Sequence, residues 1–161
     1  YIKQADVLQG LYFFEDDFST EELRRNFEFY EPRTVHESSL SPCVHSILAA
    51  KLGMEDKAYE MYSRSARLDL DDFNNDTEDG LHITSMAGTW LAVIKGFAGM
   101  RVKDDQLHFN PFIPSKWDSF AFKIRWRGYL LEVKVTQDGV AVQEATGQDL
   151  SVVVNGKQFE V

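Results

Sequence analysis

The chain has 161 residues, enough for one domain with a sizeable core or for a small domain and a short partner. Its 43% hydrophobic, 13% aromatic and 27% charged residues are ordinary for a folded globular protein and exclude intrinsic disorder. The formal net charge of −9 disfavours nucleic acid and anionic membrane surfaces as partners, because both carry negative charge themselves.

The acidity is confined to one part of the chain. Residues 1–100 hold 9 Lys and Arg against 18 Asp and Glu, whereas residues 101–161 hold 8 of each. The single cysteine, Cys43, cannot form an internal disulfide and favours a reducing compartment, so we expect a cytoplasmic protein. No apolar stretch approaches the length of a membrane span, and we expect no signal peptide.

Helices are predicted throughout the first hundred residues. The first has apolar residues at helical spacing, including Ile2, Leu8 and Leu11, but no capping residue precedes it and Tyr1 replaces a start methionine. We therefore expect this chain to be a piece of a longer protein. A second helix is predicted from Ser19-Thr20-Glu21-Glu22, an N-cap signal, up to Pro32.

Three more helices follow in the prediction. One begins at Ser41-Pro42, buries one apolar face and ends at Gly53. Another begins at Glu55, and the last covers residues 85–100.

Beyond Arg101 the apolar period becomes alternating, which predicts strands over 120–126, 131–135, 140–142 and 152–154. The turn signals between them are Arg127-Gly128, Asp138-Gly139, Gly147 and Asn155-Gly156. The fold class predicted is therefore α+β, with helices over residues 1–104 and a small antiparallel sheet domain over residues 105–161.

The loop from Tyr30 to Ser41 gathers charged, imidazole and hydroxyl groups between two helices, where side chains can converge on a ligand. A polar connection whose Ser41 caps the next helix explains it equally well. A second loop, from Asp76 into the helix that carries Trp90, offers free N–H groups to an anion, with His82 beside them. The acidic run of residues 69–76 lacks the ligand pattern of an EF-hand, so it is interpreted as a solvated loop, and no metal site is expected.

Three segments form a recognisable set in order and spacing: Lys3-Gln4-Ala5-Asp6-Val7, His36-Glu37-Ser38-Ser39-Leu40-Ser41 and Asp79-Gly80-Leu81-His82-Ile83-Thr84-Ser85-Met86-Ala87-Gly88-Thr89-Trp90. They resemble the C-terminal part of glycoside hydrolase family 65, the disaccharide phosphorylases for maltose, trehalose, kojibiose and nigerose. The resemblance continues through Gly96-Phe97-Ala98-Gly99-Met100-Arg101 and Ile113-Pro114-Ser115-Lys116-Trp117, so it covers essentially the whole chain. It implies the last helices of an (α/α)6 barrel followed by a small antiparallel β-sandwich domain.

The activity implied by the resemblance is an inverting phosphorolysis. Inorganic phosphate attacks the anomeric carbon of an α-glucosyl disaccharide, most closely maltose, and the products are glucose and β-glucose 1-phosphate. The glutamate that acts as general acid in the family lies upstream of this segment, so the chain alone is expected to be inactive. No cofactor is expected, because phosphate is a substrate, and the full-length protein is expected to be a homodimer.

The resemblance also assigns residues to the two substrates. Lys3 and Gln4 are expected to contact the glucosyl unit, while Ser38, Ser39 and His82 are expected to hold phosphate. The resemblance leaves two roles open for Glu37, which could hydrogen-bond the sugar or order the loop that carries Ser38 and Ser39. Hydroxyls, an imidazole and a helix N-terminus are suitable neutral or weakly positive donors for a dianion that must bind and then react.

Three alternatives compete with a maltose phosphorylase. Trehalose or kojibiose phosphorylase is the nearest, because the residues that distinguish these acceptors lie mostly outside this segment. A hydrolase of the same fold would need a carboxylate base instead of phosphate. A free-standing carbohydrate-binding module is disfavoured by the uncapped first helix.

Overall fold

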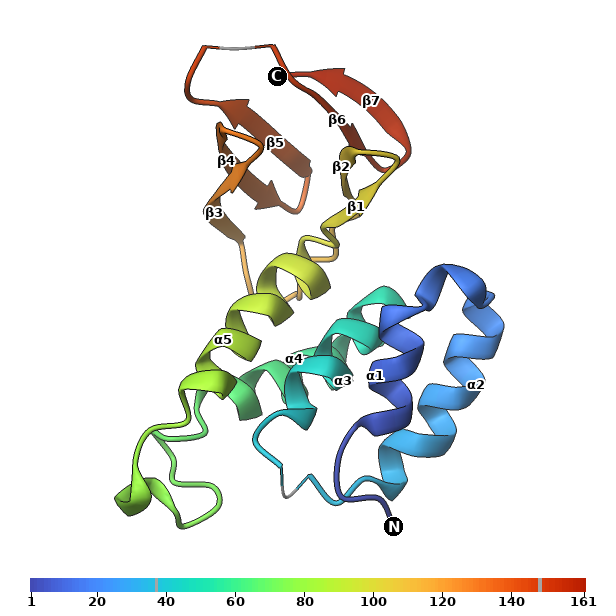
Figure 1. The fold of residues 1–161 in the computed structure, drawn as a ribbon, viewed down its shortest axis with the longest axis vertical. Coiled ribbons are helices and arrows are strands. Elements are labelled where there is room, and N and C mark those ends of the chain that lie inside the picture. Colours follow the sequence, from blue (N-terminus) through green and yellow to red (C-terminus); the bar gives the residue numbers. More distant parts are fainter. Residues whose placement is uncertain (37, 148) are drawn as a thin grey trace. The chain divides into compact units, whose positions relative to one another are not determined.

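The computed structural model describes residues 1–36, 38–147 and 149–161 (Figure 1). They form two compact units, Tyr1–Gly96 and Phe97–Val161. The domain boundary expected after residue 104 stays a prediction. Among the described residues, no helix is long and apolar enough to cross a lipid bilayer.

The first unit is helical. Its elements are α1 (Asp6–Phe13), η1 (Glu15–Asp17), α2 (Thr20–Tyr30), η2 (Glu31–Arg33), α3 (Ser41–Lys51), α4 (Glu55–Ala66), η3 (Thr77–Asp79), α5 (Ile83–Leu91) and the π-helical segment η4 (Ala92–Phe97). Helix α3 packs against α1, α4 and α5, and nearly all of its residues are buried rather than the single face expected. A helix buried all round is the centre of its unit.

Local sequence signals explain where these helices begin and end. The side chain of Ser19 accepts the N–H of Glu22, and the Glu22 carboxylate accepts the N–H of Ser19 in return, which confirms the predicted start of α2. Gly53, with a φ of +70°, follows the end of α3 as predicted. Ser41 does not cap its own helix. Its hydroxyl accepts the N–H of Ala5, immediately before α1.

The last helix differs from the prediction of one α-helix over residues 85–100. It starts earlier, at Ile83, and continues after Leu91 as the wider η4. Six residues of π-helix change the apolar spacing too little for periodicity to separate them from α-helix. Gly88 lies against the side chain of Cys43 on α3, so a side chain at this position would meet Cβ and Sγ at 3.0 Å.

The second unit consists of strands. They are β1 (Arg101–Lys103), β2 (Gln106–Phe109), β3 (Ser119–Trp126), β4 (Tyr129–Thr136), β5 (Gly139–Glu144), β6 (Ser151–Val154) and β7 (Lys157–Glu160). One sheet has the order β1-β2-β6-β7 and the other β3-β4-β5, and Figure 1 shows the two sheets of this unit as separate layers. The buried core side chains include Phe122, Leu131, Val133 and Val135 from the second sheet and Leu107, Phe109 and Val152 from the first.

The sequence analysis predicted β3 to β6 and the turn that precedes β7, but it gave no range for β1, β2 or β7. Arg127-Gly128 and Asn155-Gly156 form tight turns with positive φ at both residues, as expected for two-residue hairpins. The β1–β2 hairpin was missed because its turn, Asp104-Asp105, lacks a glycine and its strands are short. Pairing is antiparallel except between β2 and β6, which run parallel, so the expectation of a purely antiparallel domain needs this correction. Those two strands are far apart in sequence, and alternation within a strand does not predict its neighbour.

Candidate functional site

The segment predicted to contact sugar lies at the start of the helical unit. Ile2 forms a bridge with Thr34, in which the Ile2 N–H donates to the Arg33 carbonyl at 2.9 Å and the Val35 N–H donates to the Ile2 carbonyl at 2.9 Å. This pairing holds the first residues beside the loop that precedes α3. Lys3, directly after the bridge, is exposed and available to a ligand.

A hydrogen bond joins the segment predicted to contact sugar to the loop predicted to hold phosphate. The hydroxyl of Ser38 donates to Oε1 of Gln4 at 3.3 Å and accepts the N–H of Leu40 at the same distance. Ser39 is half-buried, and Ser41, two residues further on, is fixed to Ala5. The structure therefore brings together two segments that lie more than 30 residues apart in sequence. Glu37 lies outside the described residues.

His82, the third residue predicted to bind phosphate, is held by carboxylates. Its Nδ1 lies 2.6 Å from Oδ1 of Asp69, and its backbone N–H donates to Oδ2 of the same side chain at 3.0 Å. Its Nε2 lies 3.4 Å from Oδ2 of Asp76. A single carboxylate thus fixes both the backbone and the ring of the residue that precedes α5.

These carboxylates raise the pKa of His82 above its ordinary value. The hydrogen bond with Asp69 is the largest cause, and the charge of Asp76 acts in the same direction. A raised pKa keeps the ring protonated to higher pH, so both of its nitrogens can donate hydrogen bonds. With Nδ1 taken by Asp69, an anionic ligand would be bound through Nε2, displacing Asp76, whose side chain is about one-third exposed.

Ser38 and Ser39 lie in the loop before α3 and His82 immediately precedes α5, and these two helices pack against each other. Gly88 of α5 contacts Cys43 near the start of α3, and His82 lies six residues before Gly88, about 9 Å along the helix axis. Within the described parts of the chain, no hydrogen bond joins His82 directly to Ser38 or Ser39.

The structure shows how the charged side chains near these residues are directed. Arg33, the cation nearest the phosphate loop in sequence, lies 4.0 Å over the ring of Phe29 and donates to its carbonyl at 2.6 Å, so it is directed back along α2. The acidic run interpreted as a solvated loop contains both partners of His82. A carboxylate preceding a histidine by 13 residues has no spacing signal, so sequence reasoning missed Asp69.

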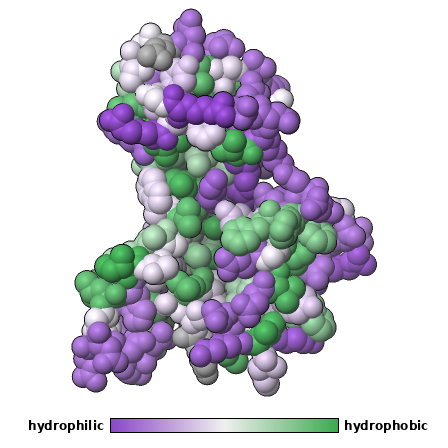
Figure 2. Space-filling model, in the orientation of Figure 1, coloured by the Kyte–Doolittle hydropathy of each residue, from purple (hydrophilic) through white to green (hydrophobic). Residues whose placement is uncertain are grey.

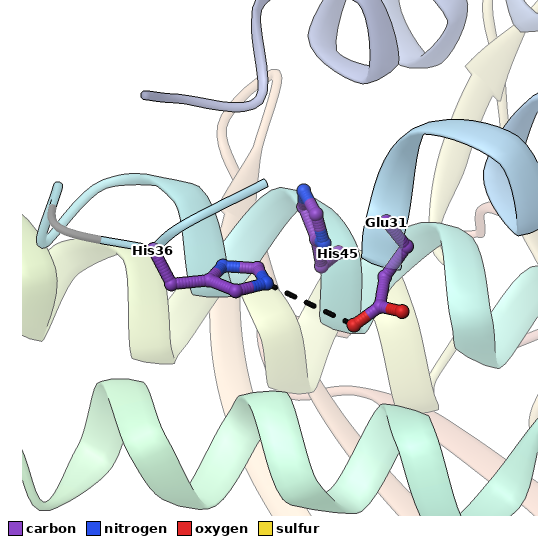
Figure 3. A group of neighbouring side chains, drawn as sticks. All are labelled: Glu31, His36 and His45. Atoms are coloured by element: carbon purple, nitrogen blue, oxygen red, sulfur yellow. Dashed lines mark ion pairs between the residues drawn. The ribbon is translucent and has the colours of Figure 1, made fainter. Parts of the chain in front are cut away.

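A separate cluster of titratable groups lies in the same unit. Glu31, His36 and His45 each contribute one nitrogen or carboxylate oxygen to a group of atoms that lie within 4.8 Å of one another (Figure 3). Burial lowers the pKa of His45 to about 3 and also lowers the pKa of His36, so both rings are neutral near pH 7. Sequence reasoning assigned this cluster no role.

Comparison with known proteins identifies the family. Residues 1–91 match the profile of the glycosyl hydrolase family 65 central catalytic domain, and residues 100–161 match that of the glycosyl hydrolase family 65 C-terminal domain. The chain belongs to glycosyl hydrolase family 65. The order of helices before sheets agrees with this assignment and confirms the predicted α+β class.

Relatives with different substrates in their names match almost the whole chain. Maltose phosphorylase of Bacillus subtilis is 58% identical over 154 residues, which are 96% of this chain. Alpha,alpha-trehalose phosphorylase of Thermoanaerobacter brockii is 44% identical over 98% of the chain, and kojibiose phosphorylase of Halothermothrix orenii is 40% identical over 99%. A solved structure from the human microbiome, assigned as a kojibiose phosphorylase, superposes with a TM-score of 0.92 at 43% identity.

The matched region is a small part of each relative. The chain spans 20% of the maltose and trehalose phosphorylases and 21% of the kojibiose phosphorylase. The superposition with the solved structure includes 99% of this chain but only 24% of the solved chain.

Proposed function

We propose that this chain is the C-terminal part of an inverting glycoside phosphorylase that cleaves maltose with inorganic phosphate. The observation that carries the choice of maltose is the difference in identity over nearly the same residues. The chain is 58% identical to a maltose phosphorylase, against 44% and 40% for the trehalose and kojibiose phosphorylases. The products are glucose and β-glucose 1-phosphate.

In this proposal the helical unit supplies the phosphate site. Ser38 and Ser39 donate hydroxyl hydrogen bonds to phosphate oxygens, and the protonated ring of His82 adds a charge-assisted one through Nε2. Asp69 holds the ring through Nδ1, which leaves Nε2 for phosphate once Asp76 is displaced. Neutral donors and one cation suit a phosphate that must leave its site as a nucleophile, since a tighter clamp would stabilise the bound reactant too strongly.

The sugar side is assigned to Lys3, Gln4 and Glu37. The hydrogen bond between Gln4 and Ser38 supports this arrangement, because it links the residue proposed for the glucosyl unit to a residue proposed for phosphate. Phosphate and the anomeric carbon have to meet for the reaction, so their ligands must be adjacent. The proton for the leaving sugar oxygen comes from a glutamate upstream of this chain.

The rest of the protein is inferred from the family. We assign the helical unit to the end of an (α/α)6 barrel completed by preceding residues, and the whole protein to a cytoplasmic homodimer. Exposed apolar side chains of α5 support the barrel, because Ile83, Met86, Trp90 and Leu91 need cover from other helices. Figure 2 shows such side chains over the first turns of α5.

The test uses the full-length protein with maltose, trehalose or kojibiose, each with and without phosphate. We expect phosphate-dependent release of β-glucose 1-phosphate, with maltose giving the highest kcat/KM. A preference for trehalose or for kojibiose would assign the protein to the corresponding phosphorylase subgroup. Kojibiose phosphorylase is the second candidate, because the 43% identical solved structure carries that name. Release of free glucose alone, at a rate independent of phosphate, would show a hydrolase and contradict the phosphate site.

A further inference from the structure

The helical unit buries eight polar or charged side chains, and two of them stand apart from the rest. The hydroxyls of Ser41, Ser46, Ser65, Ser85 and Thr34 each have a hydrogen-bond partner, and the Glu15 carboxylate lies 3.1 Å from the ammonium of Lys51. Within the described residues, the only buried side-chain nitrogens or oxygens left without a hydrogen bond are the four ring nitrogens of His36 and His45. An unpaired buried polar group destabilises a folded protein by about 1–3 kcal/mol, so a pair of such rings requires an explanation.

The two rings lie together and next to a carboxylate. His45 is fully buried on α3 and His36 is 9% exposed, and their ring centroids are 4.6 Å apart at 75°. The nearer oxygen of Glu31 lies 3.8 Å from Nε2 of His36, too long for a hydrogen bond. Figure 3 shows the three side chains close together, from the start of η2, the following loop and α3.

We propose that Glu31, His36 and His45 bind one divalent transition-metal ion of the Zn²⁺ type. Two imidazole nitrogens and one carboxylate oxygen are the ligands that zinc takes at about 2.0–2.2 Å, with water in the remaining position of a tetrahedron. Ligand atoms around such an ion are about 3.3 Å apart. The three ligand atoms are separated by up to 4.8 Å, and small side-chain rotations would shorten these separations to about that value.

The backbone at this point supports a built site rather than an accidental meeting. His36 has a φ of +54°, a left-handed conformation that is unfavourable for residues with a side chain. Arg64 donates to the His36 carbonyl at 3.0 Å and holds this conformation, which directs the ring inward. A bound ion would therefore anchor the start of the loop that continues to Ser38 and Ser39.

One neighbouring group opposes the ion. The ammonium of Lys57 lies 3.0 Å from Oε1 of Glu31 and competes with the metal for that carboxylate. It also lies 2.8 Å from Oε2 of Glu60, which can retain it when the ion binds. The affinity for zinc should therefore rise when the charge of Lys57 is removed.

The experiment measures zinc bound to the full-length protein after removal of all metal and dialysis against Zn²⁺, with Mg²⁺ as a comparison. We expect one Zn²⁺ per chain to be lost in His45→Leu and in His36→Asn, and Glu31→Gln to weaken binding at least about 10-fold. Lys57→Met should bind zinc more tightly than the unmodified protein. Cobalt should give a visible absorption band that is absent from His45→Leu.

Two features keep the outcome decisive. His45→Leu replaces a buried ring whose nitrogens make no hydrogen bond with an apolar side chain, so we expect the variant to fold and a loss of zinc to report the lost ligand. His108→Asn, in β2 of the other unit, is the matched histidine control and should keep its zinc. Equal zinc content in the unmodified protein and His45→Leu, or selective binding of Mg²⁺, would overturn the proposal.

Discussion

The two compact units differ in what they bury. The helical unit buries two histidines, a glutamate and several hydroxyls, whereas the buried side chains described in the strand unit are apolar. The helical unit also holds the entire charge imbalance, since residues 101–161 are neutral overall. Buried polar groups are tolerated only where they are paired or used, because burial without a partner is unfavourable. This difference agrees with our proposal that the helical unit carries the binding residues, whereas the described core of the strand unit is apolar.

The largest expected effect concerns the division of labour between this chain and the residues upstream of it. We expect the isolated 161-residue chain to show no phosphorolysis of maltose, because in our proposal the general acid lies upstream of it, and such an acid contributes about 10²–10⁴-fold. An assay for glucose 1-phosphate with equal amounts of isolated chain and full-length protein makes the comparison. Turnover by the isolated chain would show that the helical unit contains its own acid.

The next effect tests whether the strand unit is stabilised by its apolar core. Leu131→Ala, at a fully buried position in β4, should lower the free energy of unfolding by about 2–5 kcal/mol. The matched control is Leu70→Ala, because Leu70 is 78% exposed and its truncation should change stability by less than about 0.5 kcal/mol. Denaturant titration of both variants gives the two values. Similar losses would contradict the assignment of the core.

A smaller effect tests the edge of the helical unit. Ser19→Ala removes the hydroxyl that accepts the Glu22 N–H at the start of α2 and should lower the free energy of unfolding by about 1 kcal/mol. Thr20→Ala, one residue further on, is the control and should change stability less. Denaturant midpoints at an unchanged m-value provide the measurement. Equal midpoints for Ser19→Ala and the unmodified protein would show that the cap contributes nothing.

The smallest effect concerns the electrostatics of His82. Its pKa should lie above the ordinary value in the unmodified protein and fall back towards that value in Asp69→Asn, because the neutral amide stabilises the protonated ring less. NMR titration of the ring protons follows this shift. Phosphate KM should then begin to rise at lower pH in Asp69→Asn, since the ring loses its proton earlier. An unchanged pKa would remove Asp69 from the site.

The same comparison explains how much the sequence could predict. The capping box at Ser19 and the turn at Asn155-Gly156 were predictable because their signals lie within four residues. The π-helical η4 was not predictable, because its apolar spacing is close to that of an α-helix. The parallel pairing of β2 with β6 was not predictable either, because these strands are far apart in sequence.

The site divides in the same way. The family resemblance pointed to Lys3, Gln4, Ser38, Ser39 and His82, and the structure joins Gln4 to Ser38. The hydrogen bond between Asp69 and His82 and the ring contact between His36 and His45 form only when loops and helices pack together. No residue spacing predicts such contacts.

The most direct measurement compares phosphate KM and maltose KM in the full-length protein carrying Ser38→Ala and Ser39→Ala together. Removal of two neutral donors worth about 0.5–1.5 kcal/mol each should raise phosphate KM by roughly one to two orders of magnitude, with a far smaller change in maltose KM. His82→Ala should act in the same direction, Lys3→Ala should weaken the sugar side instead, and Ser119→Ala in β3 should change neither constant. A rise in maltose KM with phosphate KM unchanged would show that this loop is not the phosphate site.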